Sequence, residues 1–125
     1  MKKMFLFLAV AGISMSSYAQ SEKYVKAMEK LVPAVDTTHS LEGLLDLSAA
    51  FERIANAEKT QWLPYYYAAL CQVNLGNMYF AQGQADKIDP LMDKAEPMLN
   101  KAEELEKNNA EIFCLKKKIG LFLNF

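Results

Sequence analysis

Apolar residues recur three and four positions apart through most of the chain, which is the spacing of one face of a helix. The pattern predicts a first helix over about 22–34, limited by Pro33, and a second helix over 41–57. The polar stretch 36–40 between them is expected to be a loop with helix-capping residues. The chain has no Asn-Gly or Asp-Gly turn and no sustained alternation of period two, so no strand is predicted.

The segment 63–81 is apolar on nearly every side, with Gln72, Asn74 and Asn77 as its conspicuous polar side chains. A helix of this kind is either buried among other helices or inserted in a membrane. The run Tyr65–Tyr67, the three amides and Pro64 argue against a membrane span. We therefore expect a central helix with neighbours on several sides. Its first turn tolerates Pro64, because first-turn amides have no partner within the helix.

Two further helices are predicted in the C-terminal third. Asp89 is expected to cap a helix that has proline at its first position and extends to about Lys107. Pro97 lies inside this helix and predicts a bend or a later start, because it removes a backbone donor. Asn108 is expected to cap the last helix, and Glu111 three residues later completes a capping box.

A shift of 48 residues partly superposes this pattern on itself. The shift takes Leu47, Phe51, Ile54, Lys59 and Tyr65 onto Ala95, Leu99, Ala102, Lys107 and Phe113. The run Ala95, Leu99, Ala102 resembles the second helix of a tetratricopeptide repeat, where small, large and small apolar residues recur at this spacing, and 108–111 resembles the turn between repeats. Lys107 stands where that family usually has proline. The period exceeds the family's ~34 residues by about 14.

The resemblance implies an all-α fold of antiparallel helix pairs stacked as a short tetratricopeptide-like solenoid. Such a module would bind a protein or peptide in a groove lined by the first helix of each pair, without catalysis. The candidate partner-binding residues are Trp62, Tyr65, Tyr66, Ala69, Gln72 and Asn77. The amide side chains among them have donors and acceptors that can pair with a bound backbone.

Trp62 and the run Tyr65–Tyr67 form an aromatic cluster that supports an alternative function. On a helix these rings point in several directions, so they cannot all reach one core. One interpretation packs Trp62, Tyr66 and one neighbour between helices. The other leaves a tyrosine free to stack on a peptide or sugar ring, which would make the chain a small-ligand or glycan binder.

No residue pattern predicts an enzyme, a metal site or a cofactor. His39 is the only histidine and lies in a polar loop. No Cys-x-x-Cys, His-x-x-x-His or Glu-x-x-His spacing and no glycine-rich phosphate loop is present. Asp86, Asp89 and Asp93 lack the glycine and terminal glutamate of a calcium loop. The formal net charge of −1 and the absence of a basic face argue against nucleic acid as a partner.

Residues 1–19 have the pattern of a cleaved signal peptide: Lys2 and Lys3, an apolar run, and small residues at Ser17 and Ala19. The apolar run is shorter than the ~20 residues needed to span a bilayer. We therefore expect export of a bacterial protein to the periplasm or the medium, with residues 20–125 as one helical-repeat domain and no membrane span.

Cys71 and Cys114 lie in apolar helical runs and are predicted to be buried, free thiols. Leu121, Phe122, Leu123 and Phe125 have no following helix to cover them. Either the chain is a truncated form of a longer repeat protein, or the bare face pairs with another copy, or these residues fold back into a local groove. All three interpretations stay open.

Overall fold

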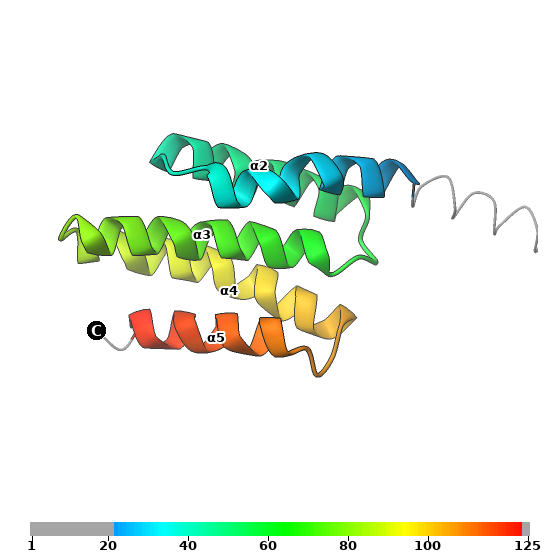
Figure 1. Ribbon diagram of the computed structural model, residues 1–125. Helices are drawn as coiled ribbons and strands as arrows, with labels where there is room; N and C mark the ends of the chain where they lie inside the picture. Colours follow the sequence, from blue (N-terminus) through cyan, green and yellow to red (C-terminus); the bar gives the residue numbers. More distant parts are fainter. Residues whose placement is uncertain (1–21, 124–125) are drawn as a thin grey trace, which may run out of the picture.

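The computed structural model describes residues 22–123, which form helices that alternate in direction along the chain (Figure 1). The elements are an N-terminal helix over residues 22–37, α2 (Leu41–Ala57), α3 (Leu63–Ala81), a 3-10 turn η1 (Ala85–Lys87), α4 (Ile88–Leu105) and α5 (Ala110–Leu123). The described residues contain no strand, so the predicted all-α class is confirmed. The predicted signal peptide and Phe125 lie outside the described residues.

Helix α3 is the centre of the fold, as its all-round apolar sequence predicts. It packs against α2 and α4 along much of its length and also contacts α5 and η1. Small buried residues such as Ala68 and Ala69 let the neighbouring helices approach closely. At Gly76 the approach is tight enough that an added Cβ would lie 2.9 Å from Cε of Met92.

The core consists of one apolar stripe from each helix packed around α3. The fully buried large side chains include Leu44, Phe51, Leu75, Met92, Leu99, Ile112 and Ile119. Each such side chain contributes roughly 1.5–3 kcal/mol relative to remaining exposed. The periodicity that predicts the helices therefore also selects the residues that stabilise them.

The bounds of α2 and α3 are those that the sequence predicts. Ser40 caps α2, because its Oγ accepts a hydrogen bond of 3.0 Å from the amide of Gly43. Pro64 lies in the first turn of α3, where it removes no helical hydrogen bond. At both starts the local signal and the apolar period agree.

The N-terminal helix extends to residue 37, so the predicted end near Pro33 is wrong. The amide of Thr38 donates to the carbonyl of Ala34 at 3.0 Å and closes the last turn beyond the proline. Pro33 is exposed, and so is Glu29, whose carbonyl loses its donor. Water can satisfy that carbonyl, which lowers the cost of the proline.

The start of α4 also differs from the prediction. The helix begins at Ile88, so Asp89 is not its cap, and the later start offered for Pro97 is wrong as well. The preceding residue, Lys87, makes no capping hydrogen bond with its side chain. Ile88 is buried in the core, and its burial favours continuing the helix back from Asp89 into η1.

The cap of α5 is shifted by one residue from the predicted capping box. Asn109 Oδ1 accepts hydrogen bonds from the amides of Glu111 (2.9 Å) and Ile112 (3.2 Å). Asn108 has a backbone φ of 62°, the left-handed conformation that asparagine tolerates better than most residues. Asn108 therefore makes the turn, and Asn109 caps the helix that begins at Ala110.

Helices α2 and α4 end at positions 48 residues apart, Ala57 and Leu105. The amide of Glu58 donates to the carbonyl of Ile54 at 2.8 Å, and the amide of Glu106 donates to that of Ala102 at 2.9 Å. Both cap residues leave the helical conformation, with φ/ψ of −113°/70° and −137°/88°. Helices α2 and α4 therefore end in the same way.

Candidate functional site

The N-terminal helix, α3 and α5 together enclose a hollow of about 360 Å³, which we call the three-helix hollow. It is lined by Val32, Val35, Asp36, Tyr66, Tyr67, Leu70 and Glu111. Helix α3 supplies the two tyrosines and Leu70, while each flanking helix supplies one carboxylate. These segments are far apart in sequence, and the fold brings them together.

A second hollow of about 420 Å³ adjoins the first along α3 and α5. It is lined by Tyr66, Leu70, Ala110, Glu111, Cys114, Leu115 and Lys118. Because Tyr66, Leu70 and Glu111 line both hollows, the two form one continuous surface, which we call the tyrosine groove. Its α5 wall is exposed at Glu111, Cys114 and Lys118.

The aromatic rings of the groove are held by contacts with one another. Tyr67 stacks on the buried ring of Phe51, with centroids 5.2 Å apart and an interplanar angle of 22°. Tyr66 meets Tyr67 edge to face at 5.3 Å and Trp62 at 5.8 Å. Pairs of this kind contribute about 0.5–1.5 kcal/mol beyond their buried area. The rings are therefore ordered before any ligand arrives.

The two phenols of the groove stay protonated at neutral pH. Burial raises the pKa of Tyr66, and the negative charge of Glu111 raises it further. Burial raises the pKa of Tyr67 too, followed by the charges of Glu111 and Asp36. Both hydroxyl groups therefore keep their protons and can donate hydrogen bonds.

A third hollow of about 370 Å³ lies where the N-terminal helix meets the start of α2. It is lined by Val35, Asp36, Thr38, His39, Leu44, Asn74, Asn77 and Met78. His39 is exposed there. Within residues 22–123, no group of three His, Cys, Asp or Glu side chains is placed to hold a metal ion.

The fourth hollow, of about 690 Å³, surrounds the turn between α4 and α5 and is larger than each of the other three. Its lining residues are Asn100, Glu103, Glu104, Lys107, Asn108, Asn109, Ile112 and Phe113. Most are exposed charged or amide side chains, and only Ile112 is buried. Each hollow of the tyrosine groove is smaller, but the ordered rings and apolar floor make the groove the better candidate site.

The structure separates the six residues that the sequence predicts for partner binding. Tyr66 lines the tyrosine groove, and Asn77 lines the third hollow. Trp62 and Tyr65 are half-buried and line none of the four hollows described above.

The predicted partner-binding role of Ala69 and Gln72 is wrong, because their side chains are 0% and 1% exposed and cannot line a groove. Both lie on sides of α3 that face its packed neighbours.

The sequence pattern does not predict Asp36, Leu70 and Glu111 as groove residues. Leu70 follows Tyr66 by four residues, so helical spacing alone places it on the same face. Asp36 and Glu111 come from other helices and carry no local signal, because only the tertiary fold brings them to α3.

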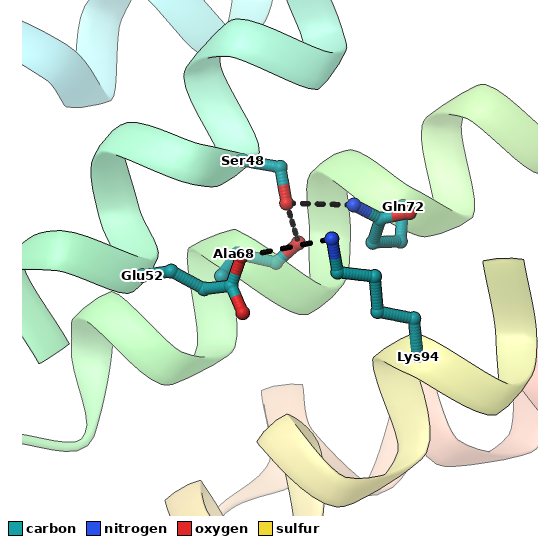
Figure 2. Close-up of polar contacts among 5 residues, drawn as sticks. All are labelled: Ser48, Glu52, Ala68, Gln72 and Lys94. Carbon is teal, nitrogen blue, oxygen red and sulfur yellow. Dashed lines mark hydrogen bonds and ion pairs between the residues drawn. The ribbon is translucent and has the colours of Figure 1, made fainter. Parts of the chain in front are cut away.

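Gln72 instead belongs to a buried polar network between α2 and α3 (Figure 2). Its Nε2 donates to Ser48 Oγ at 2.9 Å, and Ser48 Oγ donates to the carbonyl of Ala68 at 3.0 Å. Gln72 Oε1 is buried without a hydrogen-bond partner. Nearby, Lys94 of α4 extends to within 3.8 Å of Glu52 on α2. These contacts tie the helices together and make no opening for a ligand.

Both cysteines are free, as predicted, but only one is buried. Cys71 lies inside α3, and burial raises the pKa of its thiol to about 12. Cys114 is exposed in the tyrosine groove, so its predicted burial is wrong. Helix α5 packs mainly on α4 with few contacts to α3, which leaves this side of it open.

The apolar residues near the end of α5 divide between core and surface. Phe122 is half-buried against the core, with its ring 6.3 Å from that of Phe80. Leu121 is 64% exposed and Leu123 is 41% exposed. The interpretation in which these residues fold back into a local groove therefore holds for Phe122 but not for Leu121 and Leu123.

Comparison of the chain with protein-family models, curated proteins and solved structures gives no significant match. The tetratricopeptide resemblance therefore stays a prediction from the residues. Among the helices of residues 22–123, none combines the length and the apolar character that a membrane crossing requires.

Proposed function

We propose that this chain is a non-catalytic helical-repeat module that binds a protein or peptide segment in the tyrosine groove. The observation that carries the proposal is the convergence of side chains from three helices that are not consecutive. The N-terminal helix, α3 and α5 each contribute to one surface. In a tetratricopeptide-like arrangement these are the first helices of successive pairs, whose shared face binds partners.

The shape and lining of the groove favour an extended segment. Two adjoining hollows continue across three helices, with an apolar floor at Leu70, aromatic edges, and polar groups along the exposed wall. Sites for small molecules usually enclose most of the ligand's surface. The glycan alternative has less support, because Trp62 and Tyr65 lie outside the hollows and Tyr67 already stacks on Phe51.

We also propose that the chain is a short tetratricopeptide-like solenoid and that a signal peptide directs its export to the periplasm or the medium. The matching ends of α2 and α4, 48 residues apart, support a repeated helix pair. The alternating directions of the helices support antiparallel pairing. The export signal depends on the sequence pattern of residues 1–19.

Binding to an array of synthetic twelve-residue peptides, followed by fluorescence anisotropy on the hits, tests the proposal. Leu70→Gln should weaken binding of the hits by about tenfold, because it makes the apolar floor of the groove polar. Leu91→Gln is the matched control, since Leu91 is a half-buried leucine on α4 that lines none of the described hollows. Equal affinity of wild type and Leu70→Gln would contradict the proposed site.

A further inference from the structure

The three-helix hollow has two carboxylates and no basic group among its lining residues. Asp36 stands on the N-terminal helix and Glu111 on α5, so they border the hollow from opposite sides of α3. Among residues 22–123 neither carboxylate forms an ion pair, whereas Glu52 and Glu103 pair with lysines. Two exposed carboxylates around an aromatic floor thus lack a cation.

We propose that the tyrosine groove selects a partner segment with an arginine or lysine side chain whose charged head lies between Asp36 and Glu111. This inference rests on the proposed function and names the chemistry of the partner. The hollow of about 360 Å³ can hold one long side chain. The occupant is a basic peptide segment, because charge complementarity to the unpaired carboxylates is the most specific feature of the surface.

The floor of the hollow fits the remaining parts of such a side chain. An arginine or lysine has an apolar stem that can lie against Leu70 and Val32 while its head stays near water. Tyr66 borders the same space, and a cation near the face of an aromatic ring is attracted by the negative charge of that face. Both phenols stay neutral because their pKa values are raised, so the negative charge of the hollow comes from the two carboxylates.

Lys118 gives the groove a direction. It lines the adjoining hollow on α5 and is absent from the lining of the three-helix hollow. A second cation placed beside Lys118 would be repelled. The segment should therefore have its basic residue at the Asp36 end and a neutral or acidic residue at the Lys118 end.

The two cysteines provide a direct measure of occupancy. Cys114 lies in the groove and is exposed, while Cys71 is fully buried, so N-ethylmaleimide should react with Cys114 in the folded protein. The probes are three peptide pools with the same random apolar residues and with arginine, glutamine or glutamate at one fixed central position. We expect the arginine pool to slow alkylation at about tenfold lower concentration than the glutamine pool, with the glutamate pool weakest. Raising salt should narrow the difference.

Variants then assign the preference to individual charges. Asp36→Asn and Glu111→Gln should each reduce the arginine-to-glutamine ratio by about threefold, the size typical of exposed pairs, and Lys118→Gln should leave or increase it. Asp46→Asn is the control, since Asp46 is an exposed carboxylate on α2 that lines none of these hollows. Circular dichroism and rates without peptide establish that each variant is folded and reactive.

The outcomes separate the two proposals. Equal protection by all three pools would overturn the selection of a basic segment and leave peptide binding standing. Protection mainly by the glutamate pool, or an arginine preference unchanged in the Asp36 and Glu111 variants, would also overturn it. No protection by any pool would contradict both proposals.

Discussion

Cys71 shows at the residue scale how burial fixes the chemistry of a group. The thiol lies inside the central helix, and desolvation raises its pKa to about 12 from a reference value of 9.0. The thiolate is therefore nearly absent at neutral pH, and Cys71 acts as a small apolar residue. Cys114 on α5 is exposed, so thiol reagents can reach it.

We expect the free energy of unfolding to fall as the pH rises above about 9. Between pH 9 and 12 the unfolded chain has lost the Cys71 proton while the folded chain retains it, so ionisation favours unfolding. The loss is at most about 4 kcal/mol, at about 1.4 kcal/mol per unit of pKa. Tyr24, Tyr66 and Tyr67, whose pKa values are also raised, add to it above pH 10.

Urea unfolding in the presence of a reductant from pH 7 to 11 measures this dependence. Cys71→Ala should lower stability at pH 7 but flatten the alkaline decline, whereas Cys114→Ala should leave the decline as in wild type. Parallel curves for wild type and Cys71→Ala would contradict the burial of the thiol.

The network of Ser48 and Gln72 makes a second prediction at this scale. Ser48→Ala leaves the buried Nε2 of Gln72 without its acceptor and should cost about 1–3 kcal/mol. Gln72→Leu removes both the donor and the unpaired Oε1, so it should be close to neutral. In the double variant the cost of Ser48→Ala should shrink, which a double-mutant cycle by urea unfolding measures. Additive costs would mean that the hydrogen bond is not formed.

At the scale of single elements, local signals predict a helix well where they agree with burial. Ser40 and Pro64 lie at the starts of α2 and α3, and both helices have the predicted bounds. Asp89 and Pro33 are equally clear local signals, yet α4 starts before one and the N-terminal helix continues past the other. Burial of Ile88 and exposure of Pro33 decide these two cases, and neither is visible in a local motif.

The start of α5 makes a testable case of the same kind. Asn109→Ala removes the side chain that accepts from two backbone amides and should destabilise the protein by about 1 kcal/mol. Asn108→Gly should be neutral or stabilising, because glycine adopts a φ of 62° without strain. Thermal unfolding distinguishes capping by Asn109 from the predicted capping box. If Asn108 were the cap, Asn108→Gly would remove the capping side chain and destabilise the protein, and Asn109→Ala would have almost no effect on stability.

At the scale of the whole molecule, the sequence predicts the class and the central helix but only part of the site. The all-round apolar pattern of α3 places it at the centre and gives no sign of which side remains open. In the sequence Gln72 and Tyr66 are therefore equal candidates for the groove, while packing buries Gln72 and leaves Tyr66 half-buried in the groove. Asp36 and Glu111 line the same hollow only because the tertiary fold brings their helices to α3.

We propose that the surface shared by the N-terminal helix, α3 and α5 binds a basic peptide segment. Backbone amide chemical shifts, recorded while the best-protecting peptide of the arginine pool is added, test it most directly. We expect saturable shifts concentrated in residues 32–36, 66–70 and 110–118, and we expect Glu111→Gln to need about threefold more peptide for the same shifts. Shifts confined to the hollow at the turn between α4 and α5, or to the outer surfaces of α2 and α4, would contradict the account.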